Sequence, residues 1–223
     1  TGYTAVMPRE LLTANNSDLN KLLVTDKTAV DTDNTFLIHL QSRQFKKAVS
    51  GDLLAIYPKN DHRERLYSIG KINDKIQLSV KLYEHGLGSV FLNSLNNGDS
   101  IKARLIKNRH FRFPKKTPRV IMICNGTGIA PFLGMSNENR SKTAIDLYCG
   151  FRTSASFALY EDFLEEQLTN KRLNTYKLCL SREGKKEYVS HRLLKDKEYI
   201  WNILYTGGAV MICGSLTMQT DVL

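Results

Sequence analysis

The sequence predicts two domains, an antiparallel β-barrel followed by an α/β domain with a parallel, Rossmann-like sheet. The first half holds short β-branched or aromatic segments separated by turn signals, whereas the second half alternates short apolar runs with helix-like segments. The change of pattern falls near KKTPR, where Pro114 and Pro118 bracket a polar linker. We therefore expect a barrel domain over residues 1–116 and an α/β domain over residues 117–223.

The predicted strands of the first half are short and end at turn signals such as NDK and NNGD. One short helix, SVFLNSL at 89–95, is expected to interrupt them. The expected strand segments are TFLIHL (35–40), DLLAIYP (52–58), RLYSIGKI (65–72), KIQLSVKLY (75–83) and SIKARLI (100–106).

In the second half, four short apolar runs each end in a cysteine and alternate with the helix-like segments SFALYEDFLEEQL and HRLLKDKEYIWNILYTGG. The cysteines lack the close pairing of a zinc site or a dithiol redox motif. We therefore expect no bound metal and a reducing compartment. The thiols should lie along the carboxyl edge of the sheet, where doubly wound folds bind ligands. The four cysteines are Cys124, Cys149, Cys179 and Cys213.

Composition indicates a globular chain, since 42% of its residues are apolar and its formal net charge is +10. The longest apolar runs are far shorter than the roughly 18 residues of a membrane span, and no signal-peptide pattern opens the chain. We expect a cytoplasmic protein. Residues 1–118 carry 19 Lys and Arg against 11 Asp and Glu, so the positive charge gathers in the predicted barrel. Because the first residue is Thr1, we also expect a processed chain or a fragment.

The loop CNGTGIAPF follows the predicted strand VIMI and has the features of a phosphate-binding loop. Gly126 and Gly128, around Thr127, let the backbone approach an anion closely. A helix starting near Ala130, with Pro131 in its first turn, would direct free N–H groups at a phosphate. The loop is not the common dinucleotide fingerprint, which would require glycine where Pro131 stands.

The segment RLYS at 65–68 places a cation, a ring and a hydroxyl close together. In an extended strand Arg65 and Tyr67 share one face, while Leu66 and Ser68 share the other. One face therefore offers a charge and a flat ring to a single ligand. The alternative interpretation of this segment is a half-buried strand with an arginine on the protein surface.

Eight motifs together resemble the FAD- and NADPH-binding half of the ferredoxin–NADP reductase superfamily. Within it, the sulfite reductase flavoproteins and the microsomal NADPH–cytochrome reductases are most similar. The resemblance covers the whole chain, with the motifs in family order. They are YPKND, RLYS, HGLGSVFL, FRFP, CNGTGIAPF, YCGFR, SRE with KKEYVSH, and ICGSLTM.

On the flavin side, the resemblance implies that Arg65 pairs with the FAD pyrophosphate, that Tyr67 lies against the isoalloxazine ring and that Ser68 reaches flavin N5. A guanidinium, an aromatic ring and a hydroxyl suit these three partners. The loop that wraps the pyrophosphate corresponds to Gly86, Gly88 and Ser89. Val80 matches a backbone contact to the flavin, with core packing as the alternative.

On the nucleotide side, the resemblance implies that the phosphate loop is Gly126, Thr127 and Gly128, and that Arg152 lies near the NADPH phosphates. A cluster that reads the adenosine 2′-phosphate corresponds to Ser181, Arg182, Lys186 and Tyr188. Two cations and two hydroxyls suit one doubly charged group, which implies NADPH rather than NADH. Cys213 matches a cysteine beside the nicotinamide carbon that gives up hydride, so Ser68 and Cys213 are the candidate catalytic residues.

The sequence departs from the family pattern in its phosphate loop. Relatives usually have GPGTG, whereas this chain has CNGTG, with Cys124 for glycine and Asn125 for proline. Two-flavin relatives also insert a helical domain before the RxYS strand, for which there is no room between Asp61 and Glu64. We therefore expect at most one flavin in this chain, and we expect the polypeptide to continue past Leu223.

The resemblance implies an FAD-dependent NADPH oxidoreductase that passes electrons to a one-electron acceptor. We expect an acidic carrier, which could be a flavodoxin, a ferredoxin or an FMN domain elsewhere in the same polypeptide. The chain could also be the cytosolic module of a larger membrane reductase. The alternative is a nucleic-acid-binding module without redox activity, because Phe111 and Phe113 interleave with cations in KARLIKNRHFRFPKK.

Overall fold

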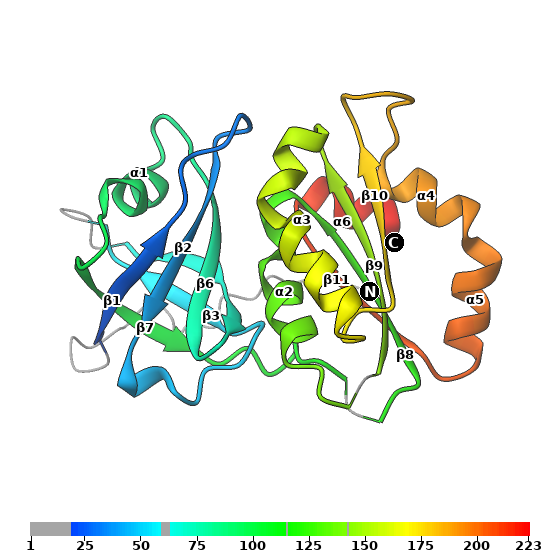
Figure 1. Cartoon of the computed structure of the whole chain (residues 1–223), viewed down its shortest axis with the longest axis horizontal. Helices are drawn as coiled ribbons and strands as arrows, with labels where there is room; N and C mark the ends of the chain where they lie inside the picture. The colour runs from blue at the N-terminus through cyan, green and yellow to red at the C-terminus, as the bar shows by residue number, and fades with distance from the viewer. Residues whose placement is uncertain (1–18, 59–62, 115, 142) are drawn as a thin grey trace.

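The structure is a computed structural model that describes residues 19–58, 63–114, 116–141 and 143–223. It contains two sheets that lie beside each other, a seven-stranded antiparallel sheet and a four-stranded parallel sheet (Figure 1). The predicted fold class, a β-barrel followed by an α/β domain, is confirmed. Residues 59–61 of the YPKND motif lie outside the described residues.

The antiparallel sheet forms a nearly closed barrel with the strand order β4-β3-β7-β1-β2-β6-β5. Its core contains the inward-facing apolar residues of these strands, and the short helix α1 contributes Leu92. The predicted helix is present in this half, and each predicted strand segment contains at least one strand. The elements are β1 (Asn20–Lys27), β2 (Thr35–Gln41), the 3-10 helix η3 (Arg43–Phe45), β3 (Leu53–Ile56), β4 (Arg65–Ser68), β5 (Gly70–Ile72), β6 (Lys75–Lys81), α1 (Leu87–Ser94) and β7 (Ser100–Ile106).

The segment RLYSIGKI forms two strands rather than the single predicted one. Between β4 and β5, the backbone N–H of Ile69 donates to Asp52 and its carbonyl accepts from Gly51. The chain therefore leaves the β3 ladder at Ile69 and joins β6 instead. This bend places β4 and β5 at the two ends of the strand order and brings the barrel close to closure.

Strand β1 was absent from the sequence prediction, although it pairs with both β2 and β7. Its alternation is brief, because only Leu22 and Val24 of its eight residues are buried. The predicted turn NDK, by contrast, is present between β5 and β6. Asn73 and Asp74 both adopt positive φ, as a two-residue hairpin turn requires.

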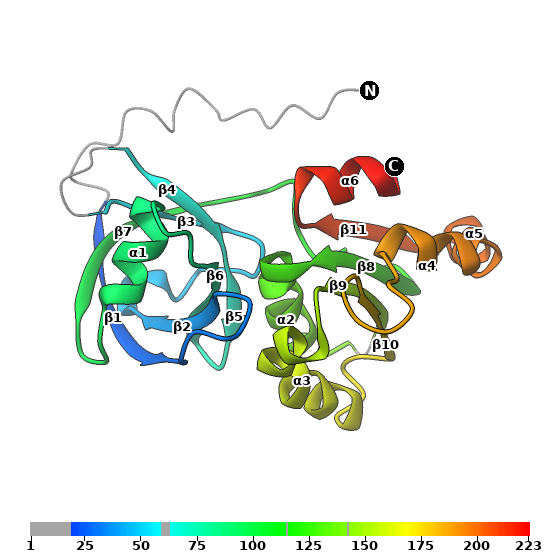
Figure 2. The same ribbon diagram turned by 90° about the horizontal axis from the view of Figure 1, so that it is seen from above.

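The parallel sheet has the order β10-β9-β8-β11 and carries helices on both faces (Figure 2). One face packs on α2 and α3, and the other on α4, α5 and α6. The predicted βα alternation is thus confirmed. The elements are β8 (Arg119–Asn125), the 3-10 helix η4 (Gly126–Ile129), α2 (Ala130–Asn137), β9 (Ala144–Phe151), α3 (Ser154–Thr169), β10 (Thr175–Leu180), α4 (Val189–Lys195), α5 (Lys197–Tyr205), β11 (Ala209–Cys213) and α6 (Leu216–Val222).

The segment 191–208 contains parts of two helices, α4 and α5, rather than one continuous helix. They meet at Asp196, whose carboxylate accepts hydrogen bonds from Tyr148 at 3.0 Å and Lys177 at 2.6 Å. These bonds tie the junction to strands β9 and β10 and hold the pKa of Asp196 below its usual value, against the opposing effect of desolvation. The helix breaks where the chain is anchored to the sheet.

The four cysteines form a row across the parallel sheet. Cys124 is in register with Cys149 on one side and with Cys213 on the other, and Cys179 is in register with Gly150. All four are free thiols, and Cys213 alone among them is partly exposed. The predicted row of thiols near the carboxyl ends of the strands is therefore confirmed.

The barrel and the parallel sheet dock through helix α2 and strand β5. A Cβ atom on Gly134 would lie 2.2 Å from Ser50 Oγ and 2.4 Å from the backbone nitrogen of Lys71, and one on Gly70 would lie 2.3 Å from the carbonyl oxygen of Ala130. Ser50 Oγ also donates to Glu138 at 2.9 Å. The two halves therefore approach more closely than any residue with a Cβ atom at Gly70 or Gly134 would allow.

Replacing Gly134 by alanine should destabilise the protein, because the added methyl group meets the backbone of β5, which cannot rotate away. We expect a loss of about 1–3 kcal/mol, the usual range for overpacking, even though alanine favours the helix itself. Urea unfolding followed by circular dichroism measures the change. An unchanged or raised midpoint would contradict the tight docking of α2 on β5.

Candidate functional site

A cavity of about 810 Å³ lies between the barrel and the parallel sheet, and both halves contribute to its walls. Most of the predicted site residues line it. From the barrel these are Arg65, Tyr67, Ser68, Gly86, Gly88 and Ser89. From the parallel sheet they are Gly126, Thr127, Gly128, Arg152, Ser181, Tyr188 and Cys213.

Strand β4 forms the barrel wall through Arg65 and Tyr67, which lie on the same side, as the alternation predicts. A Cβ atom on Gly88 would lie 2.6 Å from Tyr67 Oη and 2.9 Å from Arg65 Cγ. Burial raises the pKa of Tyr67 to about 12, so its hydroxyl stays neutral. The Arg65 guanidinium donates to the backbone carbonyl of Arg63 at 3.0 Å.

Ser89, in the first turn of α1, forms hydrogen bonds to the loop that precedes this helix. Its hydroxyl accepts from the backbone N–H of Tyr83 at 3.1 Å and donates to the carbonyl of Gly86 at 3.1 Å. The predicted role of Ser89 as a donor to a ligand therefore competes with an internal bond. The first turn of α1 still has backbone N–H groups without partners within the helix, as every helix start does.

The phosphate-binding loop predicted at 126–128 folds as the 3-10 helix η4, between β8 and α2. Gly126 has a φ of +49°, and a Cβ atom there would meet nothing within 4 Å, so this side of the loop is open. Gly128, by contrast, is tightly packed: a Cβ atom there would lie 2.3 Å from the carbonyl oxygen of Cys213. Helix α2 begins with Pro131 in its first turn, as predicted.

Ser68 and Cys213, the two candidate catalytic residues, meet across the boundary between the two sheets. Ser68 ends β4 in the barrel, and Cys213 ends β11 in the parallel sheet. Burial raises the pKa of the Cys213 thiol to about 11, and a hydrogen bond from Ser68 partly offsets that rise. The cavity thus brings a hydroxyl and a neutral thiol together from opposite halves.

Arg152, predicted near nucleotide phosphates, lies at the cavity wall and pairs with a carboxylate of the barrel. Its Nη1 donates to Asp33 at 2.7 Å, and Lys81 lies 3.0 Å from the same carboxylate oxygen. An anion that binds Arg152 must share the guanidinium with Asp33. Nothing in the sequence pattern pointed to Asp33, because its partners come from distant segments.

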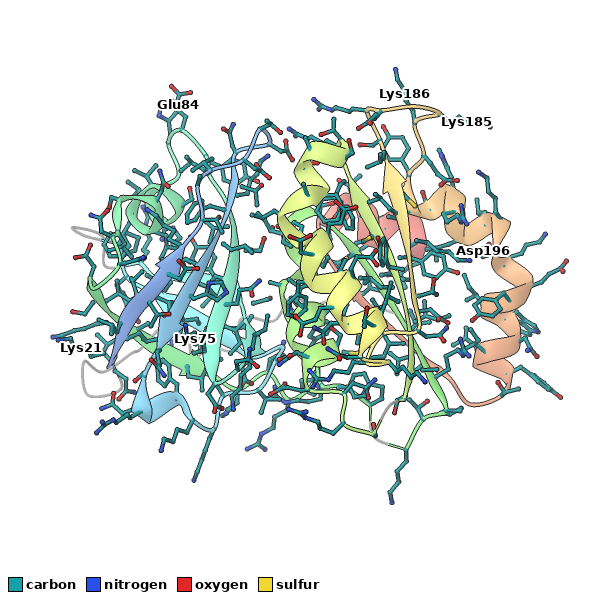
Figure 3. The ribbon with its side chains drawn as sticks, viewed as in Figure 1. Lys21, Lys75, Glu84, Lys185, Lys186 and Asp196 are labelled. Carbon is teal, nitrogen blue, oxygen red and sulfur yellow. The ribbon has the colours of Figure 1, made fainter. Side chains whose placement is uncertain are left out.

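Three predicted residues lie apart from the cavity lining. The Val80 side chain is buried in the barrel core, while its neighbours Ser79 and Lys81 line the cavity. Arg182 and Lys186 belong to the loop between β10 and α4, and Lys186 points outward from that loop (Figure 3). Of the predicted 2′-phosphate cluster, the structure brings Ser181 and Tyr188 to the cavity.

The basic segment 102–116 does not present its aromatic rings as a stacking platform. Phe111 and Phe113 pack against the core of the parallel-sheet half. Arg104 pairs with Glu64 at 2.8 Å, and Arg112 with the buried Asp52. These contacts give the segment a structural role. They do not support the alternative interpretation of the chain as a nucleic-acid-binding module.

Within the described ranges, no cluster of three or more histidine, cysteine or acidic side chains is arranged to hold a metal ion. The helices of the same ranges include none that is both long and apolar enough to cross a membrane.

A barrel and a parallel sheet that share one cavity define the two-domain fold of the ferredoxin–NADP reductases. Ferredoxin–NADP⁺ reductase from Plasmodium falciparum superposes with a TM-score of 0.80 at 21% identity, over 94% of this chain and 90% of that one. A ferredoxin NADP⁺ reductase from Neisseria gonorrhoeae, solved with bound FAD and NADP, superposes with a TM-score of 0.73 at 18% identity, covering 92% of this chain and 89% of that one.

Sequence comparison agrees with the fold. Residues 122–223 match the family model of the oxidoreductase NAD-binding domain. The chain is 36% identical to NADPH–cytochrome P450 reductase of Bos taurus over 202 residues, which are 83% of this chain and 28% of that protein. It is 28% identical to the sulfite reductase [NADPH] flavoprotein alpha-component of Vibrio parahaemolyticus over 216 residues, 88% of this chain and 34% of that protein. Over most of its length the chain is thus similar to reductases of the ferredoxin–NADP reductase superfamily, and it spans about a third of the length of these two relatives.

Among the four thiols, Cys213 should react first with iodoacetamide in the native protein, because the others are buried. With a pKa of about 11, its thiolate fraction should keep rising about tenfold per pH unit from pH 8 to pH 10. Free cysteine, with a pKa of roughly 8.5, should level off over the same range. Mass spectrometry of labelled peptides measures both rates, and a Cys213 rate that levels off near pH 9 would contradict the assigned environment.

Proposed function

We propose that the chain is an FAD-dependent NADPH oxidoreductase that passes electrons to a one-electron acceptor. The observation that carries the proposal is the shared cavity, which is lined by Arg65, Tyr67 and Ser68 of β4 together with the loop 126–128 and Cys213. The names of the relatives support it, since they include NADPH reductases and a reductase solved with FAD and NADP. When bound, FAD supplies the change from two-electron to one-electron chemistry.

The barrel wall suits a flavin dinucleotide. Arg65 provides a fixed cation for phosphate oxygens, and Tyr67 provides a ring held against Gly88, where any larger residue would collide. Ser68 offers a hydroxyl at the end of the same strand. We assign these three residues to the pyrophosphate, to the flat face of the flavin ring and to its N5 atom. Gly86, Gly88 and Ser89 would border the pyrophosphate with backbone N–H groups.

The opposite wall suits a nicotinamide dinucleotide. The open side of Gly126 and the start of α2 give phosphate oxygens access to backbone N–H groups, with Arg152 nearby. We assign the 2′-phosphate to Ser181, Arg182, Lys186 and Tyr188, which requires the loop between β10 and α4 to turn its cations inward. Cys213 would lie beside the nicotinamide ring, where its neutral thiol adds no charge.

The acceptor that we propose is an acidic electron carrier: a flavodoxin, a ferredoxin or an FMN domain. The basic character of residues 1–118 supports an acidic partner, because opposite charges steer association. The four free cysteines support a reducing compartment such as the cytoplasm.

Stopped-flow absorbance of the FAD-loaded protein tests the proposal directly. NADPH should bleach the flavin band rapidly and NADH slowly, and mixing the reduced protein with a flavodoxin or a ferredoxin should restore the band. The second step should slow as salt rises, because salt screens charges over about 8–10 Å. The proposed activity would be refuted if the protein bound no FAD, or if NADPH did not reduce the bound flavin.

Arg65→Ala should lose most of its bound FAD on purification. A charge-assisted hydrogen bond contributes roughly 1.5–3 kcal/mol, which corresponds to an affinity about tenfold to a hundredfold weaker. Arg63→Ala is a matched control, because it removes a neighbouring surface cation while leaving the Arg63 carbonyl that Arg65 contacts. Absorbance at the flavin band relative to protein measures occupancy, and full occupancy in Arg65→Ala would show that the assignment is wrong.

The double substitution Arg182→Ala with Lys186→Ala should weaken NADPH binding about tenfold or more and leave NADH nearly unchanged, since NADPH alone carries the 2′-phosphate. Lys185→Ala is the matched control, because Lys185 lies on the same exposed loop (Figure 3). Titrations of both nucleotides measure the affinities. Equal losses for the two nucleotides would assign the cluster another role.

A further inference from the structure

The last residue of β8, Asn125, joins its own loop to the loop after β11. Asn125 Nδ2 donates to Ser215 Oγ at 2.9 Å, and the backbone N–H of Ser215 donates to Asn125 Oδ1 at 2.8 Å. Ser215 is the N-cap of α6 and accepts from the backbone N–H of Met218 at 3.3 Å. One side-chain amide therefore fixes both the backbone and the side chain of the residue that starts α6.

The two loops are packed at the limit that glycine allows. A Cβ atom on Gly214 would lie 2.2 Å from Asn125 Oδ1, and one on Gly128 would lie 2.3 Å from the carbonyl oxygen of Cys213. Cys213 and Gly214 therefore sit between the Asn125 amide and the turn at Gly128. The position of Cys213 in the cavity is set by the loop after β8 as much as by its own strand.

Asn125 is also one of the two positions, with Cys124, at which this chain departs from the GPGTG pattern that it resembles. A proline there has no side-chain donor or acceptor and could make neither bond to Ser215. The amide thus links the two loops by hydrogen bonds that the usual residue cannot form.

We propose that Asn125 is a positioning residue that holds Cys213 and Gly214 against the nicotinamide end of the nucleotide; this rests on the proposed function. When a group beside the reacting atoms is displaced slightly, the rate of the chemical step falls more than the affinity for the ligand. The adenosine end is assigned to the loop between β10 and α4, which neither bond touches. Loss of the amide should therefore slow hydride transfer and spare adenosine binding.

Two substitutions at Asn125 separate positioning from general damage. Asn125→Ala removes both bonds, so flavin reduction at saturating NADPH should be about tenfold slower, while the affinity for 2′-phospho-AMP stays unchanged. Asn125→Asp can still accept from the N–H and the O–H of Ser215, so it should restore the rate. Its added negative charge beside the phosphate loop should instead weaken NADP⁺ binding. Asn202→Ala, on the exposed face of α5, is the control and should change neither quantity.

A second readout requires no bound cofactor. In Asn125→Ala the loop after β11 loses two tethers, so iodoacetamide should label Cys213 several-fold faster than in the wild type, with Asn202→Ala unchanged. Wild-type labelling together with an unaltered rate of flavin reduction in Asn125→Ala would overturn the inference. If NADPH fails to reduce the wild-type flavin, the proposed function is refuted, whereas the labelling rate still decides whether Asn125 tethers Cys213.

Discussion

The close packing of helix α2 on strand β5 is the constraint on which the rest of the site depends. Because Gly70 and Gly134 carry no side chains, backbone meets backbone between the barrel and the parallel sheet. A second contact, the buried hydrogen bond between Ser79 and Tyr160 at 2.5 Å, joins β6 to α3. Together these contacts fix how far β4 stands from β11, and so bring Ser68 to Cys213.

The glycines of the cavity serve opposite purposes. Gly88 and Gly128 have no room for a Cβ atom, so they let the protein pack on itself beneath Tyr67 and against Cys213. Gly126 has open space around it and a positive φ, so it leaves the backbone accessible to a ligand. The same residue type thus builds the rigid floor of the site in one place and an accessible loop in another.

Charge in the cavity is arranged so that its cations already have partners within the protein. Arg152 and Lys81 share Asp33, and Arg65 donates to a backbone carbonyl. Under the proposed function, a bound dinucleotide would replace these contacts with phosphate oxygens, which accept strong charge-assisted hydrogen bonds. The thiol of Cys213 stays neutral at physiological pH, since burial raises its pKa to about 11.

The sequence alone determined the two sheets, the glycine-containing loop between β8 and α2, the turn at Asn73–Asp74 and the row of cysteines, because periodicity, glycine and turn residues act over a few neighbouring positions. It did not reveal β1, whose alternation is too brief, or the break at Asp196, which depends on bonds to Tyr148 and Lys177. Tertiary structure decided which side chains meet, among them Asp33 with Arg152, Asn125 with Ser215, and Ser68 with Cys213. These pairs are 90 or more residues apart: the pairing of β8 with β11 brings Asn125 to Ser215, and the docking of the two sheets brings together the other two pairs.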